Sequence, residues 1–396
     1  MTRTAPIWLY GEVNPATPEF KVLDDGTDVS FMPLEAVWPG DKANYTNTLP
    51  WSSKRNYSQF RRGDILVPKI TPTFEAGRTT IAKVPLPLGL ASTEVHVVRP
   101  RASTDPRFLQ YCFRSLPFID EGAHSLQGVG NLRRVTSRFV QGHKVLHANP
   151  DTQRFIADYL DHETDEIDGM IAKLDELMEV LTARRHAIIA SVLASMSVRI
   201  RLTLVVDIIS GSGFPDRFQG VSGQELPFYK VSSLSLADKG YLREADNSVS
   251  RNVAAEVGAR IIPPGSVIMA KIGAALLLAR YAVTSRPACI DNNLQALVPR
   301  SKLIDSRFLA YAMEEVSISS LVKPGPVPSL DVMGIRMTDI AYDNSLEEQH
   351  RIVDHLDEVT RKIDAMIAKV SELKSLLIER RAALITDVVT GRKKVA

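Results

Sequence analysis

Two stretches of the chain repeat one another, and this duplication constrains the fold more than any other feature of the sequence. The first stretch runs from Gln153 to Val192, and the second runs from Gln349 to Val388, at an offset of 196 positions. They align without a gap over about forty residues, and about half of the aligned residues are identical. A chain of 396 residues that repeats itself at half its length is a duplicated unit, so its fold should contain the same parts twice.

The first stretch predicts one long helix. Asn149 is a suitable N-cap, and Pro150 occupies the first helical position. No further proline occurs before residue 198. Apolar residues recur at spacings of three and four and form a seam that Arg185 interrupts. The apolar positions are 167, 171, 174, 178, 181, 188 and 192. At 1.5 Å per residue, such a helix is about 65 Å long. Because it is too long to pack inside one small domain, we expect it to pair with a helix of similar length.

The second stretch predicts the partner helix. Ser345 is its N-cap, and Glu348 completes a capping box with it. Its apolar seam, interrupted by Lys374 and Arg381, consists of Ile363, Ile367, Val370, Leu377, Leu384 and Val388. Gly391 is the predicted C-cap.

The regions before the two helices also resemble each other. Residues 105–111 return as 305–311, and residues 63–70 return as 265–272, whereas the sequences between these matches differ. Short apolar runs bounded by turn residues predict strands at 29–37, 64–70 and 94–98, followed by a helix at 108–116. The stretch from Gly122 to Gly142, including 128–134, is predicted to be an ordered loop. We therefore divide the chain into domains 1–148 and 199–344 and helices 149–198 and 345–396.

The composition restricts the class of protein. The net charge is +2, but the balance is uneven, because basic residues exceed acidic ones by five in 1–148 and fall short by six in 149–198. The two cysteines, Cys112 and Cys289, suggest a reducing cytoplasm and no disulfide framework. No apolar run reaches membrane-spanning length, and the first residues lack the apolar core of a signal peptide.

No catalytic signature is evident in the sequence. The glycines at 128, 130, 211 and 213 lack the strand, helix and further residues of a nucleotide-binding loop. The eight histidines are scattered and show no metal-ligand spacing. Asn149-Pro150 is not followed by the proline and aromatic residue of an amino-methyltransferase motif, and a helix cap explains it better.

Loops that combine basic, polar and aromatic residues are candidates for DNA contacts. Arginine and asparagine can read bases, while lysine and threonine can hold phosphates. The candidates in the first domain are Lys54, Arg55, Tyr57, Lys69, Thr71, Thr73, Arg78, Arg133 and Arg134, and those in the second are Lys271, Arg280, Asn292 and Asn293. The repeated arginines Arg184, Arg185, Arg380 and Arg381 are candidates for contacts with a partner protein. For any one of these residues, a solvated charge or a favourable place late in a helix is the alternative.

With its duplicated plan, the chain resembles the DNA-specificity subunits of Type I restriction–modification systems. The resemblance is based on the helix openings 152–161 and 348–357, the segments 167–173 and 363–369, and the Arg-Arg-x-Ala segments 184–187 and 380–383. Residues 227–233 and 325–330 are similar to the family as well. The first helix departs from the pattern at Thr152, which stands where the second helix has Glu348.

This resemblance implies an α+β protein with two target recognition domains of similar mixed fold, joined by two long helices in an antiparallel coiled coil with pseudo-twofold symmetry. Each domain would read one half of a bipartite double-stranded DNA site. The chain itself would be non-catalytic and bind no cofactor. Two methyltransferase subunits would dock on the helices, bring S-adenosylmethionine and methylate adenine, and restriction/translocase subunits would join them.

Two alternatives compete with this prediction. A coiled-coil scaffold or adaptor with two protein-binding domains would show no DNA affinity in any complex. The specificity part of a fused restriction enzyme that acts alone is difficult to reconcile with the lack of a catalytic motif. Neither the two half-site sequences nor the length of the spacer between them follows from the sequence.

Overall fold

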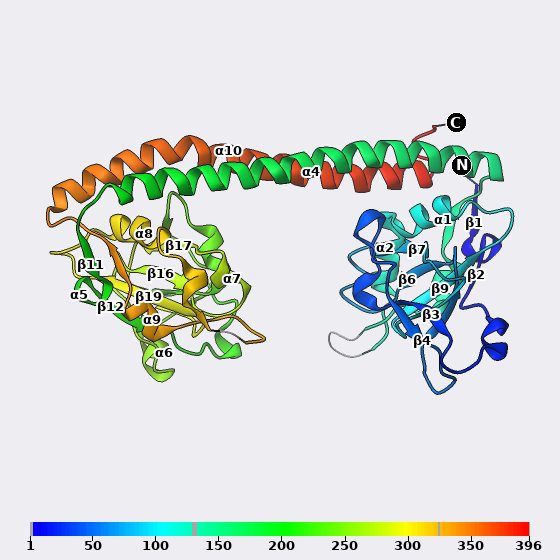
Figure 1. The fold of residues 1–396 in the computed structure, drawn as a ribbon, viewed down its shortest axis with the longest axis horizontal. Helices are drawn as coiled ribbons and strands as arrows, with labels where there is room; N and C mark the ends of the chain where they lie inside the picture. The colour runs from blue at the N-terminus through cyan, green and yellow to red at the C-terminus, as the bar shows by residue number, and fades with distance from the viewer. Residues whose placement is uncertain (1–2, 129–132, 324, 396) are drawn as a thin grey trace. The chain divides into compact units, whose positions relative to one another are not determined.

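The structure, a computed structural model, describes residues 3–128, 133–323 and 325–395 and divides into two units. Unit 1 consists of Met1–Asp175 and Ser371–Ala396, and unit 2 consists of Glu176–Val370. Each unit therefore holds one mixed α/β domain together with a segment of each long helix (Figure 1).

The two long helices begin at the predicted caps. Helix α4 spans Pro150–Ala194, and Asn149 Oδ1 accepts a hydrogen bond from the Thr152 N–H at 2.8 Å. Helix α10 spans Leu346–Val389, and Ser345 Oγ accepts one from the Glu348 N–H at 3.3 Å. The other half of the predicted capping box is wrong, because the Ser345 N–H donates to Asp343 Oδ1 at 2.7 Å, while Glu348 pairs with Arg351.

Within each unit, the helix segments pack antiparallel. In unit 1, Asp168 pairs with Arg381 at 2.7 Å, and Asp175, further along α4, pairs with Lys374, which comes earlier in α10. In unit 2, Arg185 contacts Asp364 at 2.8 Å, and the end of α4 and the beginning of α10 share a core. The predicted seam positions are buried or half-buried in both helices, Ile167, Leu181, Ile363, Leu377 and Val388 among the buried ones.

Within its described residues, domain 1 is built from three sheets and three short helices. One sheet has the order β4-β3-β8-β5, with strands Thr48–Pro50, Asp28–Met32, Leu88–Ala91 and Ser58–Arg61. The second has the order β2-β9-β6-β7, with strands Gly11–Val13, Val95–Pro100, Ile65–Pro68 and Thr80–Ile81. The third pairs β1 (Thr4–Pro6) with β10 (Lys144–Leu146). The helices are α1 (Pro106–Phe113), α2 (Leu116–His124) and α3 (Ser137–Gly142), and the 3₁₀ turns are η1 (Ile7–Leu9), η2 (Pro18–Val22), η3 (Leu34–Ala36) and η4 (Gly40–Lys42).

Domain 2 repeats this plan with altered loops. Its main sheet has the order β12-β19-β16-β17-β14, with strands Val206–Ser210, Leu294–Pro299, Val267–Ala270, Tyr281–Thr284 and Tyr241–Leu242. A three-stranded sheet has the order β15-β13-β18, with strands Ser248–Val249, Leu226–Tyr229 and Cys289–Ile290. Two-stranded sheets pair β11 (Arg199–Arg201) with β22 (Asp339–Ala341) and β20 (Val322–Lys323) with β21 (Ser329–Leu330). The helices are α5 (Leu202–Val205), α6 (Arg251–Glu256), α7 (Ala274–Leu277), α8 (Ser306–Glu314) and α9 (Val332–Arg336), and the 3₁₀ turns are η5 (Asp216–Phe218), η6 (Val231–Leu236) and η7 (Ile318–Leu321).

The core of each domain continues into the helices. In unit 1, Phe108 and Leu109 of α1 share one apolar core with Leu160 of α4 and Val388 of α10. In unit 2, the residues of α8 share a core with the end of α4 and the beginning of α10, including Phe308, Leu309, Ile189, Leu193, Val353 and Leu356. Burial of these side chains therefore fixes each domain to its own helix segments.

Some predicted elements differ from the observed ones. The helix predicted at 108–116 ends at Phe113, and Leu116 begins α2. The strand predicted at 29–37 ends at Met32, because Pro33 has no N–H to continue the ladder, and η3 follows. The loop predicted from Gly122 to Gly142 contains the end of α2 and all of α3, which Thr136 caps through a bond from the Phe139 N–H. Residues 129–132 of that stretch lie outside the described residues.

Candidate nucleic-acid interface

One edge of domain 1 collects the ends of four strands. Pro68 at the end of β6 pairs with Val95 at the start of β9, and Ala91 at the end of β8 pairs with Ser58 at the start of β5. The Ser58 hydroxyl also donates to the Val95 carbonyl at 3.2 Å. The loops 51–57, 69–78 and 92–94 therefore meet at this edge, which we call edge 1.

Four predicted DNA-contacting residues are brought together at edge 1 from distant parts of the chain. The Lys69 N–H donates to the Glu94 carbonyl at 2.9 Å, and the Thr71 N–H donates to the Arg133 carbonyl at 3.0 Å. Arg134 then donates to both carboxylate oxygens of Glu94, at 2.8 and 2.9 Å. Hydrogen bonding to Arg134 lowers the pKa of Glu94, so the acid at this edge is held ionised.

The other candidates of domain 1 are placed differently. Lys54 and Arg55 are exposed in the turn before β5, while Tyr57 packs edge-on against the Phe31 ring at 5.2 Å. Thr73 is buried. Arg78 donates to the backbone carbonyls of residues 34, 35 and 37 and lies 3.9 Å from the centre of the Trp38 ring, so most of its donors serve the fold.

The equivalent edge of domain 2, edge 2, is formed in the same way. Ala270 at the end of β16 pairs with Leu294 at the start of β19, and Met269 pairs with Tyr281 at the start of β17. The Lys271 N–H donates to the Asn293 carbonyl at 2.9 Å. Arg280, just before β17, and Asn292, just before β19, are therefore at this edge, and both are exposed.

The two edges share the backbone hydrogen bonds of the lysine but differ in the side chains around it. We call this shared set of backbone bonds the frame. The carbonyl of Lys69 accepts from the Val135 N–H at 2.9 Å, and the carbonyl of Lys271 accepts from the Leu330 N–H at 2.8 Å. Around this frame, the Glu94–Arg134 ion pair of edge 1 is replaced by Asn293 and Ser329 at edge 2. The Asn293 amide donates to Asp291 Oδ1 at 2.8 Å. The lysine is thus common to both edges, whereas its neighbours are specific to each.

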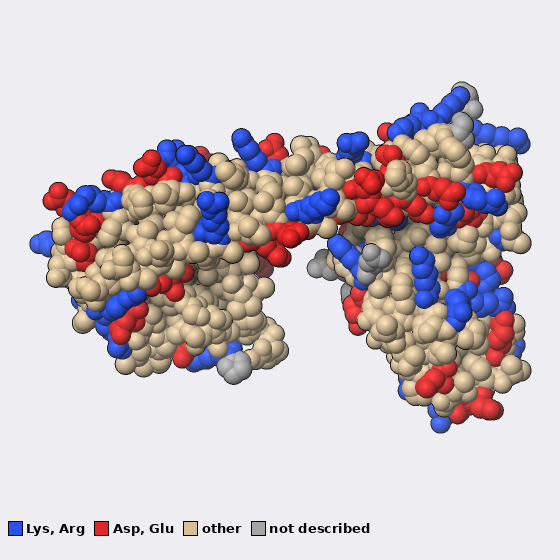
Figure 2. Space-filling view, turned by 45° about the horizontal axis from the view of Figure 1, so that its top comes forward, with Lys and Arg blue, Asp and Glu red and all other residues tan. Residues whose placement is uncertain are grey.

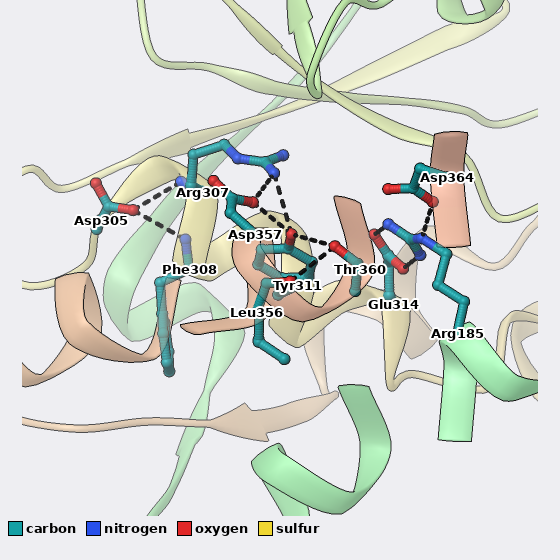
Figure 3. A network of polar contacts seen from close by, with 10 residues as sticks. All are labelled: Arg185, Asp305, Arg307, Phe308, Tyr311, Glu314, Leu356, Asp357, Thr360 and Asp364. Carbon is teal, nitrogen blue, oxygen red and sulfur yellow. Dashed lines mark hydrogen bonds and ion pairs between the residues drawn. The ribbon is translucent and has the colours of Figure 1, made fainter. Parts of the chain in front are cut away.

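The repeated arginines Arg185 and Arg381 lie where domain, α4 and α10 meet. Figure 3 shows Arg185 between Glu314 of α8 and Asp364 of α10, and it contacts Asp364 at 2.8 Å. Burial alone lowers the pKa of Arg185, but the charges of Glu314 and Asp364 outweigh burial and raise it, so the guanidinium stays charged. The contact with a partner protein predicted for these two arginines stays a prediction, and inside the chain they serve as ion-pair partners.

A second repeated contact joins each domain to the opening of a long helix. In unit 2, Asp357 accepts hydrogen bonds from Arg307 and from the Tyr311 hydroxyl, both at 2.5 Å (Figure 3). In unit 1, Asp161 accepts the equivalent bonds from Arg107 at 2.8 Å and from Tyr111 at 2.7 Å. The sequence repeats both motifs, Asp-x-Arg-Phe-Leu-x-Tyr and Gln-x-x-Ile-x-x-x-Leu-Asp, and their joint recurrence is the signal that could have paired them.

The first residue of the helix-opening motif makes a contact of its own. In unit 1, the Gln153 carboxamide accepts from the Asp105 N–H at 3.0 Å, and in unit 2, Gln349 accepts from the Asp305 N–H at 2.7 Å. Both glutamines are buried, with 2% and 0% of their surface exposed. Within each unit, the Asp-x-Arg-Phe-Leu-x-Tyr motif of the domain thus contacts the helix-opening motif of the long helix.

Arg184 and Arg380 have different surroundings from their neighbours, because they are exposed and make no ion pair with any residue that the structure describes. In unit 1, Arg380 shares one side of the helix pair with the exposed Met170, Leu373 and Leu376. Met170, Leu373 and Arg380 each precede a seam position, and in antiparallel helices such residues lie on the same side of the pair. The equivalent cluster in unit 2 consists of Met366, Leu177, Val180 and Arg184. Each unit thus carries one copy of an exposed apolar cluster with an arginine, which we call the helix cluster.

Acidic side chains follow the long helices in the view of Figure 2. This distribution matches the excess of acidic residues between 149 and 198 in the sequence. The described part of the chain contains no group of three His, Cys, Asp or Glu residues arranged to hold a metal ion. No helix within it is both long and apolar enough to cross a membrane.

Comparison with known proteins points to one class. No family model matches the chain. It is 26% identical over 197 residues to the specificity subunit of the Type I restriction enzyme EcoEI from Escherichia coli, an alignment that covers 46% of this chain and 33% of that protein. It is 29% identical over 138 residues to the EcoAI specificity subunit of the same organism, covering 34% and 23%. A solved chain from work on complex assembly and conformational transition of the type I R-M system superposes with a TM-score of 0.67 at 17% identity, covering 99% of this chain and 98% of that one.

The chain resembles Type I specificity subunits in sequence, and its fold resembles that of a solved chain from a type I R-M system. The resemblance predicted from the repeated motifs is therefore confirmed, and so is the α+β class with two domains and two packed long helices. The adaptor alternative is not favoured by these relatives. The alignments span about a third or less of the length of the curated relatives.

Proposed function

We propose that the chain is the DNA-specificity subunit of a Type I restriction–modification complex and that it reads a bipartite site in double-stranded DNA, one half with each domain. The observation that carries this proposal is the frame shared by edge 1 and edge 2. Lys69 and Lys271 have the same backbone contacts, whereas the side chains around them differ. A shared cation suits the DNA backbone, which is the same at every site, and variable neighbours suit two unlike half-sites.

At each edge, different residues are candidates for phosphate contacts and for base contacts. Lys69 and Lys271 are the candidates for phosphate contacts, helped by the exposed Lys54 and Arg55 at edge 1. The Glu94–Arg134 pair at edge 1 and Asn292 at edge 2 are candidates for base readout, since arginine reads guanine, a carboxylate accepts from cytosine and asparagine reads adenine. The small net charge of the chain suits a complex in which other subunits supply further phosphate contacts.

In this proposal the chain performs no chemistry. Two methyltransferase subunits bind it, carry S-adenosylmethionine and methylate adenine in the recognised site. Restriction/translocase subunits join the complex for cleavage. The complex acts in the cytoplasm, where the two free and buried cysteines, Cys112 and Cys289, would stay reduced.

The two helix clusters support two copies of one partner. Met170, Leu373, Leu376 and Arg380 in unit 1 correspond to Met366, Leu177, Val180 and Arg184 in unit 2, and the apolar members are between 42% and 57% exposed. Exposed apolar side chains grouped on one side of a helix pair suit an amphipathic helix of a partner. Because the cluster occurs once in each unit, one methyltransferase subunit per unit is the simplest stoichiometry.

Methylation mapping tests the DNA-reading function. The chain is co-expressed with the methyltransferase encoded beside it, and adenine methylation of host DNA is compared with that in cells lacking the chain. We expect one bipartite motif, two short specified sequences separated by unspecified bases, to become methylated only when the chain is present. An unchanged methylation pattern would overturn the proposal.

A pair of matched variants tests the docking of the methyltransferase. Leu373→Asp in unit 1 should reduce the co-purified methyltransferase from two copies to one, and Leu177→Asp in unit 2 should do the same. The double variant should bind none, as measured by mass of the intact complex. Leu204→Asp, at a 57% exposed position in domain 2, is the control and should keep both copies. Two copies on the double variant would rule out this docking surface.

A further inference from the structure

The loop that follows the common lysine differs between the edges at two exposed positions. Loop 1, residues 70–78, and loop 2, residues 272–280, have the same length, start with isoleucine and end with arginine. Glu75 and Ala76 are exposed in loop 1, and at the equivalent positions of loop 2 Leu277 and Leu278 are 53% and 57% exposed. One edge therefore presents a charged and a small side chain where the other presents two leucines.

The two loops have similar backbones in their second halves, from Phe74 and Leu276 onward. Phe74 and Leu276 are buried at equivalent positions, and the next hydrogen bonds match, Gly77 N–H to the Phe74 carbonyl at 2.8 Å and Ala279 N–H to the Leu276 carbonyl at 3.1 Å. Gly77 and Ala279 both have a positive φ, 62° and 46°. Because the buried residue before the exposed pair and the turn after it match, the pair is presented to solvent in a similar way in both domains.

Polar and further apolar residues surround the leucine pair. Lys271 precedes loop 2, Arg280 ends it, and Asn292 is exposed at the same edge. Ile272 and Val327 are 37% and 56% exposed, and the Gly273 N–H donates to the Pro328 carbonyl at 2.8 Å, which brings the segment around Val327 beside the loop. Edge 2 therefore exposes apolar side chains in loop 2 and the neighbouring segment, and its two cations lie where loop 2 joins the paired strands β16 and β17.

The pattern of repetition indicates what covers these leucines. The helix cluster, which we assign to a partner present in two copies, is repeated in both units. The leucine pair is not repeated, so it suits a ligand that differs between the two domains. In the proposed function, the two DNA half-sites are that ligand, and the flanking Lys271 and Arg280 match the charge of its backbone.

We propose that Leu277 and Leu278 determine the specificity of domain 2 by packing against the C5-methyl groups of thymines in the major groove. The thymine methyl is the apolar feature that distinguishes base pairs in that groove, and aliphatic side chains contact it. Domain 1, with Glu75 and Ala76 at these positions, reads its half-site without such a pair. This inference rests on the proposed function and identifies the bases that domain 2 reads.

Replacing thymidine with deoxyuridine tests the inference, because the two nucleosides differ only in the C5-methyl group. The full chain, in complex with its methyltransferase, is bound to duplexes in which the thymines of one half-site at a time are replaced. In the half-site of domain 2, we expect affinity to fall about fourfold for each thymine methyl that is removed. This is the change in affinity that corresponds to losing the burial of one apolar carbon against a leucine. Replacement in the half-site of domain 1 should change affinity less.

Matched variants assign the effect to the leucines. Leu277→Glu with Leu278→Ala gives loop 2 the exposed residues of loop 1 and should abolish the difference between thymine and deoxyuridine in one half-site only. Leu204→Ala, next to β12 at the opposite end of the same sheet, should leave that difference intact.

Two results would overturn the inference. One is equal binding of thymidine and deoxyuridine duplexes by the unaltered complex, and the other is a loop 2 variant that keeps the preference for thymidine. If that variant also loses a methyltransferase copy, the leucines form a protein-docking surface instead. Failure of the proposed function has a different signature, since no bipartite methylation motif would then exist.

Discussion

Arg114 and Glu314 occupy equivalent positions after the repeated Asp-x-Arg-Phe-Leu-x-Tyr motif, yet they present opposite charges to the repeated arginine of the long helix. Glu314 forms an ion pair with Arg185 in unit 2. In unit 1, burial and, to a smaller extent, the like charge of Arg381 lower the pKa of Arg114 to about 10. We call the contact of each domain with its long helices a joint. The two joints have the same architecture but different electrostatics.

This difference predicts opposite effects of charge reversal at the two joints. Arg114→Glu should stabilise unit 1 by about 1 kcal/mol, because it rebuilds the ion pair seen in unit 2. Glu314→Arg should destabilise unit 2 by about 3–5 kcal/mol, because it leaves Arg185 facing a like charge in a mostly buried place. Hydrogen exchange resolved to each unit measures both changes. A loss of protection in unit 1 on Arg114→Glu would contradict the charge argument.

Alkaline pH should weaken the joint of unit 2 through Tyr311. Burial and the hydrogen bond to Asp357 raise the pKa of Tyr311 to about 12, above its usual value of about 10. The folded protein therefore holds a proton that the unfolded chain releases, so this stabilisation is complete below pH 10 and is lost as pH rises towards 12. We expect unfolding free energy to fall by up to about 3 kcal/mol across this window.

The variant Tyr311→Phe isolates this contribution. It should cost about 1.5–3 kcal/mol at neutral pH, because the hydrogen bond to a carboxylate is removed, and it should flatten the fall between pH 10 and 12. Tyr111→Phe should act in the same way in unit 1, since Asp161 accepts the equivalent bond. Denaturant titrations at several pH values measure the effect, and an unchanged slope in Tyr311→Phe would exclude Tyr311 as its source.

The long helices and their caps could be predicted from the sequence, because both depend on local rules. A period of three and four apolar residues, an N-cap at Asn149 or Ser345 and the lack of proline are all read along the chain. The same rules treated Arg185 and Arg381 as interruptions of a seam. Their ion pairs depend on side chains more than 100 residues away, such as Glu314 for Arg185, which no local pattern reveals.

The candidate DNA edges could be predicted in part. The recurrence of Lys69 and Lys271 after apolar strands identified the shared position, and the structure adds that Arg133 and Arg134 lie beside Lys69. Arg78 and Arg280 occupy equivalent positions, so the sequence does not show that their surroundings differ. Arg78 is held by backbone carbonyls of residues 34–37, whereas Arg280 is exposed, and this difference depends on how a distant loop folds back.

Removal of the common lysine should weaken DNA binding without changing which sequence is read. Lys271→Ala should reduce affinity for specific and non-specific duplexes alike, and the slope of log affinity against log salt should fall by about one, as expected when one phosphate is no longer neutralised. Lys302→Ala, an exposed lysine after β19 at the other end of the sheet, is the control. Relaxed specificity at a single base position would instead assign Lys271 to base readout.

The length of the helices should set the distance between the two half-sites. Residues 169–175 of α4 face 374–380 of α10 in unit 1, since Asp168 pairs with Arg381 and Asp175 with Lys374. Duplicating both segments inserts one heptad into each helix, keeps the seam in phase and repeats the Asp175–Lys374 pair. Seven residues add about 10 Å of helix. Because DNA rises 3.4 Å per base pair, the unspecified spacer should lengthen by about three base pairs.

Methylation mapping reads the outcome of this insertion directly. Both half-site sequences should be unchanged, because neither edge is altered, and only the spacer between them should grow. Duplicating 169–175 alone is the control, since it puts α4 out of register with α10 and should lower stability without giving a new, longer motif. A changed half-site, or an unchanged spacer in a stably folded double insertion, would show that the helices do not set the distance. The repeated stretches would then serve docking and domain attachment alone.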